Sequence, residues 1–180
     1  MFAATDVTEA ERAAARPGDD VIANPDVVMD RAVDVDVEPD VVWPWLVQLG
    51  KRRSGWYLTR SVERLVPRRN RATRVVDPQW QDLAVGDVVP DWGGRDATFE
   101  VLALDAGRSI VYGSQRGKTH LTWTITMAPA GGGTRIFFRL RLAPIKRVWV
   151  ATSVGDFFDA LTISGMGNGL RERLAETATG

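Results

Sequence analysis

Alternating apolar and polar residues predict the first strand of this chain. From residue 31 onward the apolar positions are Val33, Val35 and Val37, and aspartates occupy the positions between them. A period of two residues is typical of a strand that has one buried face and one solvated face. The sequence therefore predicts a strand that begins near Arg31.

Two later segments, 119–127 and 134–142, show the same period over longer stretches. Four apolar residues share one face in each segment: Leu121, Trp123, Ile125 and Met127, then Ile136, Phe138, Leu140 and Leu142. The opposite faces carry mainly threonine in the first and arginine in the second, including Arg139 and Arg141. This pattern predicts a sheet with one dry face and one wet face, with both arginines directed to solvent.

Shorter β-type runs at 86–89, 97–104 and 108–113 precede these two segments. Glycines at 107 and 131–133 supply the positive φ that tight connections need, so both sites are predicted to be hairpin turns. The five runs together predict an antiparallel meander.

Helical spacing replaces alternation in two places between the first strand and the meander. A helix is predicted over 39–49, because Pro39 suits a first turn and apolar residues recur at the right interval before Gly50. Trp45 should point away from Trp43 and lie at the rim or be exposed. A second short helix is predicted from Thr59 or Ser61 to Leu65. Near the N-terminus, Thr8 and Glu11 have capping-box spacing.

The last segment, about 145–175, is predicted to be one long helix that glycines weaken or kink. Its apolar positions include Val148, Leu161, Met166 and Leu170, and Gly165, Gly167 and Gly169 interrupt it. The glycines suit either a local hinge or close packing of the helix on the sheet. Since this helix is the only large element available to cover the sheet, we expect an α+β fold in which a curved antiparallel sheet wraps around it.

Composition fits one ordinary domain that follows a short lead-in. The 180 residues are 44% hydrophobic and 26% charged, and 23 basic residues balance 23 acidic ones. That balance removes the positive field with which proteins collect phosphates, so no nucleic-acid partner is expected, and the basic runs at 51–53 and 68–71 are interpreted as solvated loops. We expect a lead-in over 1–24 and a folded domain over 25–180.

Features that the sequence lacks limit the cellular location and the kinds of site that the protein can have. There is no cysteine, and the N-terminal segment is acidic where an export signal would be basic. No run approaches the length of a membrane span. The sequence predicts a soluble, cytoplasmic protein without a membrane span, and it leaves the oligomeric state open.

Six short motifs spread along the chain are informative when taken together: the runs Val42–Gly50, Arg53–Tyr57 and Val85–Asp87, the pair Thr122–Trp123, and the runs Gly133–Arg135 and Pro17–Asp19. They resemble the SRPBCC superfamily, also called START/Bet v 1-like, and in particular its polyketide cyclase/dehydrase and lipid-transport branch. The resemblance implies a helix-grip fold with a cavity between the sheet and the last helix. It also implies that the loop over 53–57 borders the entrance. It implies no single activity, because one fold serves many functions.

Aromatic residues are the candidates for lining that cavity. An indole offers an apolar wall together with one N–H donor, and the chain has seven tryptophans. The predicted ligand-binding residues are Trp43, Trp56, Tyr57, Phe99, Tyr112 and Trp123. For Trp43 and Trp123 a core role and a cavity role remain equally open, and Trp56 with Tyr57 forms either a lid or a loop anchor.

Catalytic and cofactor chemistry finds little support in the sequence. His120 is the only histidine and is expected to be a solvated strand residue, so neither a metal site nor a paired general base is expected. No Gly-x-Ser-x-Gly motif occurs, and Gly165–Gly169 lacks the spacing of a nucleotide-binding loop. Nothing in the pattern requires an acid/base pair inside the fold, and no cofactor is expected.

The sequence thus favours a protein that binds or carries a small hydrophobic or aromatic ligand, of lipid or polyketide type, without catalysis. An enzyme resembling aromatic polyketide cyclases or dehydratases is the alternative, in which the cavity would orient a reactive chain. An interaction domain with a collapsed cavity is a third possibility.

Overall fold

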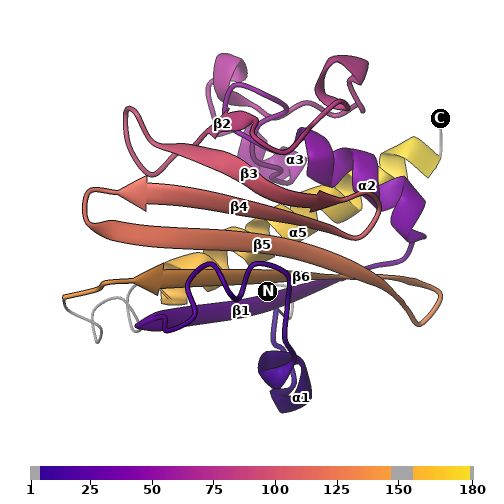
Figure 1. The fold of residues 1–180 in the computed structure, drawn as a ribbon. Helices are drawn as coiled ribbons and strands as arrows, with labels where there is room; N and C mark the ends of the chain where they lie inside the picture. The colour runs from indigo at the N-terminus through magenta and orange to yellow at the C-terminus, as the bar shows by residue number, and fades with distance from the viewer. Residues whose placement is uncertain (1–4, 147–155, 179–180) are drawn as a thin grey trace.

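The computed structural model describes residues 5–146 and 156–178 as a curved antiparallel sheet around a long helix (Figure 1). The strand order is β1-β6-β5-β4-β3-β2. The strands are β1 (Val27–Val35), β2 (Val88–Pro90), β3 (Thr98–Asp105), β4 (Ser109–Arg116), β5 (Thr119–Ala130) and β6 (Gly133–Ala143). The helices are α1 (Glu9–Ala13), α2 (Pro39–Gln48), α3 (Arg60–Glu63) and α5 (Asp156–Ala178), and the 3₁₀ turns are η1 (Arg68–Asn70) and η2 (Pro78–Trp80). The α+β prediction is confirmed.

The inner face of the sheet carries the residues that alternation assigned to it. Val33 and Ile136 are paired across β1 and β6, and both are fully buried. Ile125 of β5 lies opposite Phe138 of β6 on the same face. The first strand begins four residues earlier than predicted, at Val27, because β6 is long enough to pair with it there.

Trp45 is buried, which contradicts the expectation that it lies at the rim or is exposed. Its side chain is 1% exposed and meets the Tyr57 ring edge to face, with the ring centroids 5.6 Å apart. The prediction failed because α2 is covered on two sides. Leu46 belongs to the core against the sheet, while Trp45 and Gln48 meet the 57–77 connection, where Gln48 binds Val75 and Asp77.

Helix α5 runs along the concave side of the sheet, drawn in yellow in Figure 1. A Cβ at position 167 would lie 2.8 Å from Val33, and a Cβ at position 169 would lie 2.5 Å from the backbone of Leu58. These two glycines therefore serve close packing, whereas Gly165 has ordinary space around it. Val148 and Trp149, which the sequence placed in this helix, lie outside the described residues.

A strap over residues 12–22 covers the outer face of the sheet, which the sequence predicted to be wet (Figure 1, indigo). Thr124 donates to the carbonyl of Pro17, and a Cβ at Gly18 would lie 2.5 Å from Val111. Arg139 does point outward, yet it is only 3% exposed, because it donates to the strap carbonyls of residues 12 and 14 and pairs with Asp19 and Asp30.

Thr8 and Glu11 form the predicted capping box at the start of α1. Glu11 also reaches Arg135 of β6 at 2.7 Å, and hydrogen bonding from that guanidinium lowers the pKa of Glu11 to about 2. The lead-in is thus tied to the sheet by charge as well as by backbone contacts, and the wet-face prediction is wrong wherever the strap crosses.

Candidate ligand-binding site

A tight turn at residues 50–55 positions Trp56. The amide of Gly55 donates to the carbonyl of Gly50 at 2.9 Å, and Gly55 has a φ of +87°. A Cβ at Gly55 would lie 2.8 Å from the Cα of Ala72, so only glycine fits this approach. The turn therefore delivers the next residue, Trp56, at a fixed place beside the sheet.

Trp56 joins a continuous aromatic cluster on the inner face of the sheet. Its ring contacts Trp92 and Trp123, and the other members of the cluster are Phe99, Tyr112 and Phe138. Neighbouring ring centroids are 5.7 to 6.1 Å apart, and Trp123 stacks on both Tyr112 and Phe138. Such spacing is typical of attractive aromatic pairs and gives a rigid apolar floor.

Three adjoining pockets share Trp56 as a wall. The largest of the three is a groove of about 470 Å³ between α3 and α5, lined by residues that include Val62, Leu161 and Gly165. A second pocket of about 160 Å³ lies between Trp123 and α5, and the innermost holds about 30 Å³ beside Tyr112. The inner space is small because the aromatic cluster fills it, so most of the open volume lies in the groove.

The structure brings together four of the six predicted ligand-binding residues. Trp56, Phe99 and Trp123 line both smaller pockets, and Tyr112 lines the innermost one. Trp43 is half-buried against the core and, within the part of the chain that is described, lines none of the three pockets. Tyr57 lies outside them as well.

Tyr57 is an anchor under the loop. Its hydroxyl donates to the carbonyl of Trp45 at 2.7 Å and accepts from the amide of Gln48 at 3.1 Å. The side chain is fully buried, and burial raises the pKa of the Tyr57 phenol well above its ordinary value. With both hydrogen-bonding roles satisfied inside the protein, Tyr57 holds the chain beneath its neighbour Trp56.

One buried donor in the pockets has no partner among the described residues. The indole N–H of Trp56 is buried and makes no hydrogen bond there. The phenol of Tyr112 lies in the same innermost pocket, and burial raises its pKa above the ordinary value. An unpaired buried donor costs free energy, which a ligand oxygen placed near it would recover.

The carboxylates at the edge of the pockets are already paired. Asp91 lies 2.5 Å from Arg116 and also accepts from the backbone of Gly93. Asp159 of α5 lies 3.3 Å from Arg31 of β1. Each acid therefore has a cation beside it, and neither is placed as an unpaired general base.

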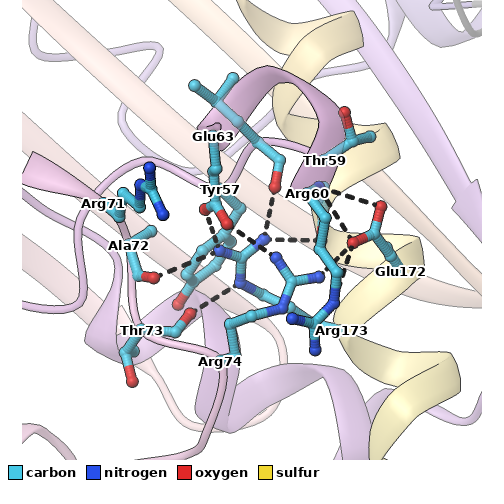
Figure 2. Close-up of polar contacts among 12 residues, drawn as sticks. Tyr57, Thr59, Arg60, Glu63, Arg71, Ala72, Thr73, Arg74, Glu172 and Arg173 are labelled. Atoms are coloured by element: carbon cyan, nitrogen blue, oxygen red, sulfur yellow. Dashed lines mark hydrogen bonds and ion pairs between the residues drawn. The ribbon is translucent and has the colours of Figure 1, made fainter. Parts of the chain in front are cut away.

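A buried ionic network fixes the two sides of the groove (Figure 2). Glu63 of α3 binds one arginine with each oxygen: Arg173 of α5 at 2.5 Å and Arg74 at 2.8 Å. Arg173 is fully buried, lies over the Tyr57 ring, and also donates to the carbonyls of residues 58, 73 and 169. Burial lowers the pKa of this guanidinium, while Glu63 opposes that effect.

Further charges complete the network at the surface. Glu172 and Glu176 of α5 bind Arg74 and Arg60. Hydrogen bonds from these two arginines lower the pKa of Glu176 to about 2. Three arginines thus balance three glutamates. The network joins α3, the 72–74 segment and α5, so it sets the width of the groove between them.

Sequence reasoning missed this network, because nothing in the local pattern requires an acid/base pair inside the fold. Glu63 and Arg173 are 110 residues apart, and no local spacing connects them. One signal was present: position 173 continues the helical series of Met166 and Leu170, so an arginine occupies the apolar face of the last helix. A charge on such a face requires a buried partner.

Comparison with protein-family models identifies the family of this chain. The family described as polyketide cyclase/dehydrase and lipid transport matches residues 26–179. The chain belongs to this family. Membership covers the sheet, the aromatic cluster and α5, and it starts just after the strap. The family description spans catalysis and carriage, so membership leaves the ligand and any reaction open.

Solved structures agree on the fold at low sequence identity. The protein Ms6760 from Mycobacterium smegmatis is 18% identical with a TM-score of 0.52, covering 84% of this chain and 93% of its own. CV1439 from Chromobacterium violaceum is 15% identical with a TM-score of 0.52, covering 82% and 96%. CalU16 from Micromonospora echinospora is 17% identical with a TM-score of 0.49, covering 84% and 86%. The first two support the helix-grip architecture.

No curated protein matches the chain. Over residues 5–146 and 156–178, no helix is both long and apolar enough to cross a membrane. The same residues contain no group of three or more histidine, aspartate or glutamate side chains placed to hold a metal ion.

Proposed function

We propose that this family member binds or carries a small apolar ligand with a flat aromatic part, held against Trp56 and the aromatic cluster. The observation that carries the proposal is that three adjoining pockets meet at Trp56, whose indole N–H has no partner among the described residues. The groove has the volume of a small-molecule site, and its lining is mostly apolar.

The expected polarity of the ligand follows from the unpaired indole N–H of Trp56 and from the hydroxyl of Tyr112 beside it. Trp56 and Tyr112 both line the innermost pocket, and each offers one hydrogen to an acceptor. A carbonyl or ether oxygen on the flat part of the ligand would satisfy either donor. A saturated hydrocarbon chain would leave the N–H of Trp56 unsatisfied, so we expect aromatic carbonyl compounds to bind more tightly than saturated lipids of similar size.

Carriage is favoured over catalysis by the state of the carboxylates. Asp91 and Asp159 each form an ion pair with an arginine, so neither of these two carboxylates lies over the aromatic floor as an unpaired base. The cyclase or dehydratase alternative would require one of these ion pairs to open when the ligand enters.

Isothermal titration with three probes tests this proposal: a hydroxyanthraquinone, oleic acid and ergosterol. The anthraquinone is expected to bind with 1:1 stoichiometry, and Trp56→Phe, which keeps an apolar ring but removes the N–H, is expected to weaken it about tenfold. Trp80→Phe is the matched control, because Trp80 is half-exposed in η2 and packs against Arg53 away from the pockets. Absence of saturable binding by all three probes, or equal losses in both variants, would contradict the proposal.

A further inference from the structure

The segment that follows α3 carries a dense positive charge in a chain of zero net charge. Residues 60–74 contain six arginines and one acid, Glu63, and that acid is buried. We name residues 64–71 the basic loop. Arg60 and Arg74 are neutralised by the glutamates of α5, but Arg64, Arg68 and Arg69 make no ion pair or side-chain hydrogen bond with any described residue. Three cations are therefore free at one site.

An aliphatic side chain stands among these cations. Leu65 is 87% exposed, the largest exposed fraction among the large hydrophobic residues described. Val62, one turn before it, is also exposed at 45% and lines the groove. An isolated exposed apolar residue is ordinary, but a leucine surrounded by free arginines combines the two attractions that hold proteins on anionic bilayers.

The basic loop is held in shape rather than left to fluctuate. Arg71 donates to the carbonyl of Val66 at 2.9 Å and to that of Arg64 at 3.3 Å, which closes the loop on itself. The amide of Asn70 donates to the carbonyl of Pro67 at 2.8 Å. At its base, Glu63 is clamped by Arg173 and Arg74 (Figure 2). Because the loop is already ordered, little conformational entropy would be lost when a partner binds.

We propose that the basic loop docks the protein on a bilayer surface that contains anionic phospholipids, with Leu65 inserted between headgroups and the free arginines on their phosphates. Charge complementarity selects an anionic partner, and the exposed leucine selects a bilayer over a nucleic acid, in whose phosphate backbone an aliphatic side chain gains nothing. Docking places Val62, and with it the mouth of the groove, next to the lipid surface. The inference does not require that the groove bind a ligand.

Vesicle co-sedimentation without ligand tests the proposal. The probes are vesicles of phosphatidylcholine alone and of roughly two parts phosphatidylcholine to one part phosphatidylglycerol. The protein is expected to bind only the anionic vesicles, and more weakly as salt is added. Each arginine near an anionic surface contributes about fivefold, so Arg68→Gln/Arg69→Gln is expected to weaken binding about 25-fold. Leu65→Ser is expected to weaken it about tenfold through lost apolar burial.

Matched controls remove the same groups elsewhere. Arg108→Gln/Lys118→Gln deletes two exposed cations at other hairpins, and Val85→Ser deletes an exposed aliphatic side chain. Both should bind anionic vesicles as the unchanged protein does. No vesicle binding at low salt, equal losses in the control pair, or tighter binding to a single-stranded oligonucleotide through the same arginines would overturn the proposal. A change of oligomeric state in Leu65→Ser with unchanged vesicle binding would also overturn it.

Discussion

Replacing Arg173 with methionine is expected to lower the free energy of unfolding by about 3 to 5 kcal/mol, because it breaks a buried ion pair from one side. Methionine keeps much of the volume but leaves Glu63 with a single arginine and strands the carbonyls of residues 58, 73 and 169. Urea denaturation followed by circular dichroism measures the change.

A control and a double variant separate charge loss from general damage. Arg171→Met alters an arginine two residues earlier in α5 that bonds only at the surface, to the carbonyl of Asp34 and to Asn168, and it should cost less than about 1 kcal/mol. Adding Glu63→Gln to Arg173→Met should recover part of the loss, since it removes the stranded charge. Similar losses in Arg171→Met and Arg173→Met would show that the network does not hold the helix.

Gly169→Ala is expected to destabilise the protein by about 3 kcal/mol, even though alanine is the better helix former. The new Cβ would lie 2.5 Å from the backbone nitrogen of Leu58 and from the carbonyl carbon of Tyr57. Backbone atoms cannot rotate away, so α5 would have to move off the anchored loop and widen the groove. Urea denaturation reads the stability, and probe binding reads the groove.

Gly165→Ala is the matched control in the same helix. The nearest atom to its Cβ would be Leu58 Cδ2 at 3.6 Å, an ordinary contact. Without a clash, the better helix propensity should stabilise the protein by up to about 1 kcal/mol. If both alanines stabilise, close packing does not explain the glycine at 169.

The inner half of the fold could be predicted from the sequence because its pattern is local. Ile125 and Phe138 belong to segments 121–127 and 136–142, in which every second residue is apolar, so their shared face followed directly. Pro39 and Gly50 likewise bracketed α2 closely. In each case burial of one face produces a pattern of apolar residues within a short stretch of sequence.

What failed depended on segments far apart in the chain. The position of Trp45 was predicted wrongly because Tyr57, which covers it, comes from a loop. The path of a loop cannot be predicted from a periodic pattern of residues. Arg139 was predicted to be solvated because the sequence of β6 does not indicate that a segment more than 115 residues earlier covers it. Four residues of the site were named from their aromatic character and the family resemblance, whereas Arg173 needed the tertiary structure to reveal its partner.

The strap also bears on how this sequence can change over time. The strap itself lies outside the segment 26–179 that the family model matches, yet Thr124 and Arg139 of the sheet hydrogen-bond its backbone and Val111 fits against Gly18. A substitution at any of these sheet positions alters the surface on which the strap packs. We therefore expect residues 12–22 to covary with the outward positions of β4, β5 and β6, so that relatives lacking the strap carry different side chains there.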